Sequence, residues 1–204
     1  MPDGPPPGIE PDLECAAAQS AGWRGCDLDW ERLQERALDA LQAGDPTEAT
    51  QLWRDAWLLA VPRFGRDDPR RATSVANLGL AARLAGSEAR ARRRFAHALK
   101  LWGAAPDWIA RMSIARRARS SLLHLRMEAT HWPAYEASLR SRSLALAREA
   151  AVCLDAAARG QPLPHRLHDR WRGEKPSAFD DMRKFLGAAL LVAAAEPEPN
   201  RNRR

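Results

Sequence analysis

The strongest constraint on the fold is an internal repeat, in which two Ala-Gly turns at Gly44 and Gly86 lie 42 residues apart. Five residues after each glycine stands an alanine, four positions further a large aromatic residue, and three positions further a second alanine. On a helix, spacings of three and four place all three side chains on one face. A face of small residues around one aromatic residue suits two closely packed helices. The repeated sets are Ala49, Trp53 and Ala56 in the first copy and Ala91, Phe95 and Ala98 in the second.

Helix start and stop signals surround both turns. "AGDP" at 43–46 and "AGSE" at 85–88 each place a glycine after one helix and a capping residue, Asp45 or Ser87, before the next. Pro69 after Asp68 suits the first turn of another helix. Alanine, leucine and arginine dominate and aromatic residues make up only 6%, which favours helix over sheet. The sequence therefore predicts an all-α protein with helices over 27–43, 46–63, 69–85, 87–103, 106–129, 133–159 and 177–195.

The ends of the chain differ in composition from its centre. Residues 1–26 begin with a proline and glycine cluster and are expected either to be disordered or to dock on the domain. Residues 27–195 form the expected helical domain, and 196–204, "EPEPNRNRR", a disordered tail. The start lacks the basic and apolar stretches of a signal peptide, and the longest apolar run, 186–195, is too short to span a bilayer. With three cysteines and no CxxC motif, a cytoplasmic protein is expected.

Residues 67–102 carry the clearest copy of the repeat. They place Asn77, Leu78 and Gly79 before the turn glycine Gly86, and the alanine and aromatic stripe after it. This arrangement resembles tetratricopeptide repeats, and the 42-residue period with its "DDP" connection is similar to the variety in kinesin light chains. The first copy, 30–67, departs from the family pattern where Asn and Leu of "NLG" would stand. A third copy is expected near residue 128, although 120–147 lacks the turn glycine.

The resemblance implies a short right-handed solenoid of antiparallel helical hairpins with C-terminal capping helices. The first helix of each hairpin would line a concave face that binds an extended peptide or a helix of a partner protein. The final helix, 177–195, fits either a cap over the open end or a docking helix for a partner. The groove residues implied by this arrangement are Thr73, Asn77, Leu80, Arg83 and Leu84 in the second copy, Glu31, Gln34, Glu35, Leu38 and Gln42 in the first, and Arg119, Leu122 and Arg126 in the third.

Each polar groove residue also has an ordinary structural role. Asn77 matches a family position whose amide pairs with the backbone of a bound peptide, but it also suits a hydrogen bond inside the solenoid. Arg83, together with Arg119 and Arg126, suits a carboxylate-rich partner segment, because guanidinium groups bind carboxylates in bidentate fashion. The alternative is that these arginines are solvated. The predicted function is that of a protein-binding adaptor, scaffold or assembly factor, with Leu80 and Leu84 giving affinity and Asn77 and Arg83 giving orientation.

The positive charge leaves a second function open. The formal net charge is +6, and "ARARRRF" at 89–95 crowds four arginines into one turn and a half. If Ala91 and Phe95 face the hairpin partner, Arg90, Arg93 and Arg94 lie on the solvent side, either as a solvated face or as a patch that contacts RNA or DNA phosphates. Only three of the 32 basic residues are lysines, and 26 acidic residues are spread among them, which weakens the nucleic-acid hypothesis.

Catalytic and metal-binding signatures are lacking in the sequence. It contains no glycine-rich phosphate loop, nucleophile elbow or HExxH motif. His165 and His168 lie near Asp169, but the sequence places no third ligand beside them, so a solvated loop is the simpler interpretation. No enzymatic activity, cofactor or metal is expected.

Overall fold

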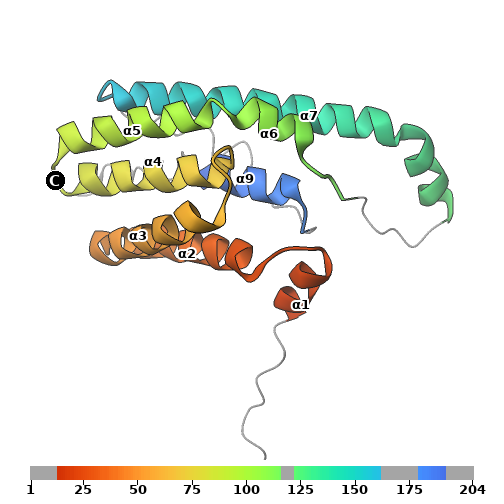
Figure 1. The fold of residues 1–204 in the computed structure, drawn as a ribbon, viewed down its shortest axis with the longest axis horizontal. Helices are drawn as coiled ribbons and strands as arrows, with labels where there is room; N and C mark the ends of the chain where they lie inside the picture. Colours follow the sequence, from red (N-terminus) through yellow and green to blue (C-terminus); the bar gives the residue numbers. More distant parts are fainter. Residues whose placement is uncertain (1–12, 116–121, 162–178, 192–204) are drawn as a thin grey trace, which may run out of the picture.

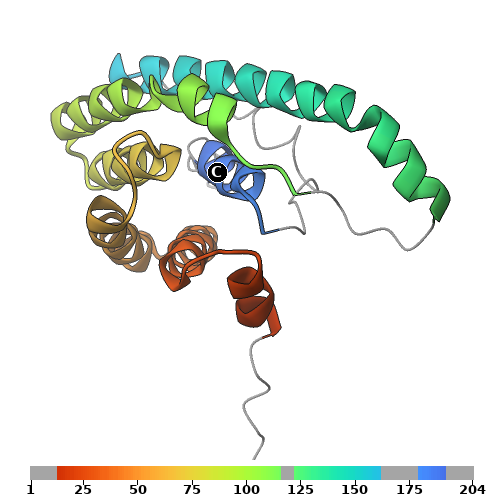
Figure 2. The same cartoon turned by 45° about the vertical axis from the view of Figure 1, so that its right-hand side comes forward.

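The structure is a computed structural model that describes residues 13–115, 122–161 and 179–191. Within these ranges all regular secondary structure is helical, as the composition predicts. Successive helices follow an arc, and the last helix lies inside its curve (Figures 1 and 2). The helices are α1 Leu13–Ser20, α2 Gly25–Gln42, α3 Pro46–Arg63, α4 Pro69–Leu84, α5 Glu88–Trp102, α6 Ala105–Arg111, α7 Leu122–Ala158 and α9 Asp181–Leu191.

Helices α2 and α3 form one hairpin, and α4 and α5 form another. Gly44 and Gly86 close the two turns with φ angles of 83° and 72°, a backbone conformation that glycine adopts without steric cost. Asp45 caps α3, because one of its carboxylate oxygens accepts hydrogen bonds from the backbone amides of Thr47 and Glu48 at 3.0 and 2.9 Å. The repeat spacing therefore predicts both turns correctly.

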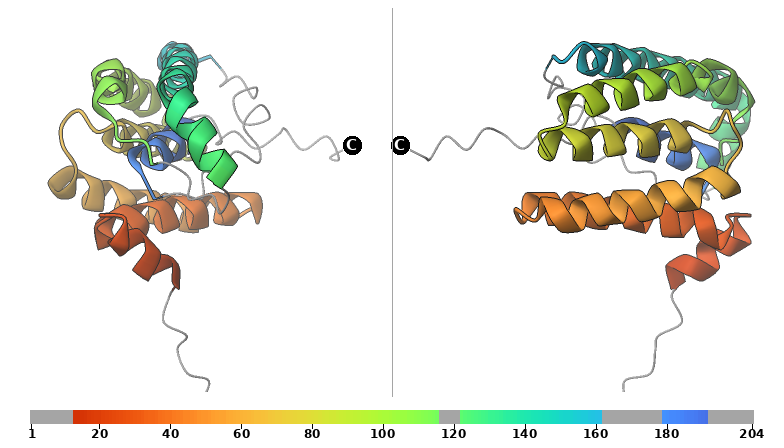
Figure 3. Two further views of the ribbon diagram at one scale, coloured as in Figure 1. Left: turned by 90° about the vertical axis from the view of Figure 1, so that its right-hand side faces the viewer. Right: turned by 60° about the vertical axis from the view of Figure 1, so that its left-hand side comes forward.

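The alanine and aromatic stripe forms the packing face of each hairpin. Trp53 and Phe95 are each 1% exposed, and the alanines beside them are fully buried. Gly79 allows α5 to approach α4 closely, because a Cβ atom at that position would lie only 3.2 Å from the Phe95 ring and from Cβ of Arg94. These small residues bring α4 between α3 and α5, so that the three helices lie side by side (right panel of Figure 3).

The chain after α5 differs from the predicted third hairpin. Helix α6 ends at Arg111 instead of continuing to 129, and α7 is one continuous helix across the break expected near residue 130. Pro133 lies within α7 and does not end it, although a proline inside a helix removes one backbone hydrogen bond. Helix α7 packs along α5, and the indole nitrogen of Trp102 donates to the backbone carbonyl of Ala147 at 2.8 Å. Within the described residues, the prediction of a third hairpin is therefore wrong.

The segment before α2 packs against the helical body. Trp23 and Ala18 are buried with Leu28 of α2 in a small separate cluster. The Trp23 ring meets Phe179 edge to face, with 5.1 Å between ring centroids. Residues 13–24 are thus docked on the domain, whereas 1–12 and the predicted tail 196–204 lie outside the described residues. Within the described ranges, no helix combines the length and apolar character that crossing a bilayer requires.

Candidate functional site

The face predicted to bind a partner is covered by α9 of the same chain. We call the surfaces of α2, α4 and α7 that contact α9 the inner face (Figure 2). The hydroxyl of Thr73 donates to the backbone carbonyl of Ala188 at 2.9 Å, and the guanidinium of Arg183 lies 2.9 Å from the Glu31 carboxylate. Met182, Phe185 and Leu186 of α9 are buried in the main hydrophobic core. Helix α9 therefore fills the inner face instead of capping an open end.

Most of the predicted groove residues hold the fold together. The Asn77 amide donates to the Gln34 side-chain oxygen at 2.7 Å, which joins α4 to α2. Leu80 is buried, and Leu38 packs against the core from a partly buried position. Of the two roles considered for Asn77, the structure shows the hydrogen bond inside the protein. Thr73 and Glu31 are predicted groove residues that do contact a helix on this face, and that helix is α9.

Arg83 and Leu84, at the end of α4, do not line the inner face as predicted. The Arg83 guanidinium donates to the backbone carbonyl of Ala157 at 3.2 Å and lies 3.4 Å from the Glu88 carboxylate. It therefore ties α4 to the end of α7. Leu84 is 37% exposed and does not line the inner face, because α9 lies beside the N-terminal half of α4 and Leu84 is the last residue of that helix (Figure 1).

The side chains of the groove residues predicted in the third copy lie outside the described part of the structure. Arg119 lies outside the described residues. Leu122 and Arg126 fall in α7, at positions whose side chains the structure does not describe. From the first copy, Glu35 and Gln42 are exposed and Glu31 is engaged by Arg183. The ten groove residues predicted in the first and second copies are thus not brought together on one accessible surface.

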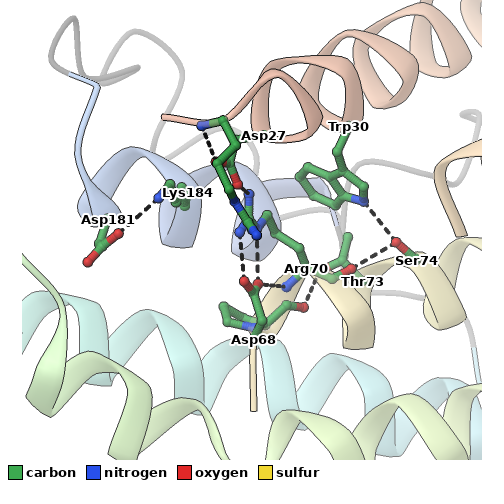
Figure 4. A network of polar contacts seen from close by, with 10 residues as sticks. Asp27, Trp30, Asp68, Arg70, Thr73, Ser74, Asp181 and Lys184 are labelled. Atoms are coloured by element: carbon green, nitrogen blue, oxygen red, sulfur yellow. Dashed lines mark hydrogen bonds and ion pairs between the residues drawn. The ribbon is translucent and has the colours of Figure 1, made fainter. Parts of the chain in front are cut away.

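A buried ionic network joins α2 to the start of α4 (Figure 4). The Arg70 guanidinium lies 2.5 Å from Asp27 and binds Asp68 through two nitrogens at 3.0 and 2.7 Å. The Ser74 hydroxyl accepts a hydrogen bond from the Trp30 indole at 2.9 Å. Burial alone raises the pKa of Asp27, but the charge and hydrogen bond of Arg70, together with the Arg24 amide and the charge of Lys184, outweigh it, so the pKa lies below its ordinary value. Because these groups are paired with each other, the network is structural.

The described residues offer little for catalysis or metal binding. No group of three or more histidine, cysteine, aspartate or glutamate side chains is placed there to hold a metal ion. Burial raises the pKa of the Cys153 thiol to about 11, so the thiol stays protonated at neutral pH and is a poor nucleophile. His165, His168 and Asp169 lie outside the described residues.

An open groove with a volume of about 1030 Å³ lies on another face of α4, between α3 and α5. We call it the outer groove. Its floor comes from the C-terminal half of α4, including Leu78, and its walls come from the N-terminal parts of α3 and α5. Trp57 is partly buried in the α3 wall, while Leu58 is 59% exposed. Arg54, Arg90 and Arg94 complete the walls. The outer groove is thus an accessible apolar surface with a basic border.

Sequence reasoning missed the outer groove, although a signal for it was present. Leu58 stands outside the stripe of small residues that Trp53 and Ala56 mark on α3, so its side chain has no place in the hairpin contact. A large apolar side chain off the packing face of a helix is a candidate for contact with another molecule. That three consecutive helices make Leu58 and Leu84 line the same groove is a consequence of tertiary structure.

No protein-family model, curated protein or solved structure matches this chain. Helix α4 has two distinct faces, an inner face that α9 fills and an outer groove that is open.

Proposed function

We propose that this protein is a binding module that holds a segment of a partner protein in the outer groove. The observation that supports this proposal is that Leu58 on one wall and Leu84 on the floor are both exposed in a groove of about 1030 Å³. Apolar side chains that converge on one hollow are typical of surfaces that bind another molecule. As an adaptor or scaffold, the protein would use its helices as a rigid support for this groove.

The shape of the outer groove suits a helix. Its α3 wall extends from Asp45 to Leu58, which at the rise of an α-helix corresponds to about 20 Å. An amphipathic helix of three to four turns has that length and can place one apolar stripe against Leu78 and Trp57. The tetratricopeptide-like pairing of α2 with α3 and of α4 with α5, which we also propose, leaves such a groove between the second helices of neighbouring hairpins.

The inner face suits a partner less well, because α9 would first have to leave it. Its release would expose Met182, Phe185 and Leu186, at a cost of about 1.5–3 kcal/mol for each side chain. It would also separate Glu31 from Arg183. A partner that entered the inner face would have to offset this cost before it bound with any net affinity.

A cytoplasmic location fits this proposal. Cys15, Cys26 and Cys153 form no disulfide, which is the usual state of thiols in a reducing compartment. A binding module of this kind would meet its partner there.

Binding of RNA or DNA is the second candidate function. Arg90, Arg92 and Arg93 are exposed along α5, and phosphate contacts need accessible guanidinium groups. The outer groove itself is a poor phosphate site, because the exposed side chains of Leu58 and Leu84 make its surface apolar. Protein binding is therefore favoured.

Photo-crosslinking from the groove rim tests the proposed function. A photoreactive amino acid at Gln51, which lines the outer groove, is expected to give a protein adduct of defined mass in lysate of the native host. Leu84→Glu is expected to reduce its yield about tenfold, which corresponds to about 1.4 kcal/mol of lost binding energy. The control places the same amino acid at Val152, which is 63% exposed on α7 outside the groove. Equal adducts from both positions, or adducts that disappear after nuclease treatment, would contradict protein binding in the groove.

A further inference from the structure

We infer that the outer groove recognises an acidic amphipathic helix, with an apolar stripe for the floor and carboxylates on both flanks of that stripe for Arg54, Arg90 and Arg94. This inference rests on the proposed function and specifies the chemistry of the partner. It follows from a comparison of the acidic and basic side chains of the groove: the acidic ones have partners within the protein, and the basic ones have none among the described residues.

The acidic residues of the groove are engaged by the protein itself. The Asp45 carboxylate accepts hydrogen bonds from two backbone amides at the start of α3. The Glu48 carboxylate lies 3.9 Å from the guanidinium of Arg36. Neither group is therefore fully available to attract a basic partner.

The arginines of the groove are not compensated. Among the described residues, no acceptor or carboxylate lies within hydrogen-bond or ion-pair distance of the guanidinium groups of Arg54, Arg90 and Arg94. Three uncompensated positive charges around an apolar surface favour a partner that carries carboxylates, since each guanidinium can bind one in bidentate fashion. The charge available in the groove is thus positive.

The position of the arginines on both walls specifies the pattern of the partner. Arg54 comes from α3, whereas Arg90 and Arg94 come from α5, and the floor of α4 lies between them. A helix seated on Leu78 and Leu84 would have basic groups on both sides. Its apolar residues are therefore expected at positions i, i+3, i+4 and i+7, with aspartate or glutamate on each flank of the stripe.

The arginines of α5 outside the groove provide a matched control. Arg92 and Arg93 are exposed but do not line the groove. Reversal of their charges changes the net charge of the protein as much as reversal of Arg54 and Arg94 does. A general attraction between a basic protein and an acidic peptide would respond equally to both pairs of substitutions. Recognition in the groove would respond only to the reversal of Arg54 and Arg94.

The test selects helical peptides of 14 residues from a displayed library on the full-length protein. The expected winners contain more aspartate and glutamate than lysine and arginine around the apolar stripe. Their affinity, measured by fluorescence anisotropy at 0.15 M salt, is expected to fall at least tenfold in the R54E/R94E variant and less than twofold in R92E/R93E. Neutral or basic winners, or equal losses in the two variants, would overturn the inference.

Failure of this inference can be distinguished from failure of the proposed function. If crosslinking from Gln51 captures a partner protein while the selected peptides are not acidic, the groove binds protein and the acidic specificity is wrong. If neither experiment yields a protein or peptide, both are wrong. A single-stranded oligonucleotide serves as the further probe, and its binding with a steep salt dependence, lost in R92E/R93E, would favour nucleic-acid recognition by α5 instead.

Discussion

Arg70→Ala is expected to lower the free energy of unfolding by about 3–5 kcal/mol in denaturant titrations at pH 7. The Arg70 side chain is 3% exposed and forms ion pairs with Asp27 and Asp68, whose side chains are 1% and 10% exposed. Its guanidinium also lies 3.6 Å from the centroid of the Phe64 ring. The truncation removes this contact and leaves two carboxylates in a site with little water, which accounts for the large expected effect.

The pH dependence identifies the cause of this loss. In the native protein the pKa of Asp27 is lowered, because the charge and hydrogen bond of Arg70, with the Arg24 amide and the charge of Lys184, outweigh the effect of burial. The resulting stability is present above the ordinary carboxyl pKa near 4 and is lost as the pH falls through the native value. Without Arg70, burial raises the pKa of Asp27. As the pH falls, the variant therefore protonates Asp27 at a higher pH than the native protein does, and the cost of the buried charge disappears. The stability difference between native protein and variant is therefore expected to narrow from pH 7 to pH 4.

An exposed ion pair provides the control for this experiment. Arg36 and Glu48 are 3.9 Å apart and more than half exposed, so Arg36→Ala is expected to change the stability little. A loss below 1 kcal/mol for Arg70→Ala, or a difference from the native protein that stays constant between pH 7 and pH 4, would contradict the structural role of the buried network.

Phe185→Ala is expected to cost about 3–5 kcal/mol of stability, as for other large aromatic side chains removed from a core. Phe185 is fully buried on α9, and its ring centroid lies 6.1 Å from that of Trp102 and 6.2 Å from that of Trp108. The substitution leaves a cavity between α9, α5 and α6. Denaturant unfolding, followed by the fluorescence of the eight tryptophans, measures the stability.

The matched control removes an apolar side chain from the surface. Val152→Ala on α7 is expected to change the free energy of unfolding by less than about 0.5 kcal/mol, because Val152 is 63% exposed. If Phe185→Ala had an effect as small as this, α9 would not be part of the core. The inner face would then be accessible to a partner, as the tetratricopeptide resemblance implies.

The first two hairpins could be predicted because their signals are local. Glycine at Gly44 and Gly86, proline at Pro46 and Pro69, and the capping aspartates mark the ends of helices within a few residues. The expected helices 46–63 and 69–85 therefore coincide closely with α3 and α4. The buried stripe was equally visible, since helical periodicity alone determines which side chains share a face.

The parts that could not be predicted depend on contacts between distant residues. The sequence shows that 177–195 contains an amphipathic helix, but it does not show that Thr73 and Glu31 hold that helix on the inner face. Similarly, Asn77 is suited to a peptide or to Gln34, and only the packing of α2 against α4 decides between them. For this reason the accessible surface is the outer groove and not the predicted inner face.

Hydrogen exchange of the full-length protein, with and without a selected helical peptide, tests most directly whether a partner enters the outer groove while α9 stays in place. Slower exchange is expected in residues 46–58 and 84–94 when the peptide is bound, with no change in α9 at 181–191. Faster exchange in α9, together with protection of α2 and the N-terminal half of α4, would mean that the partner displaces α9 from the inner face and that the outer groove is not the binding site.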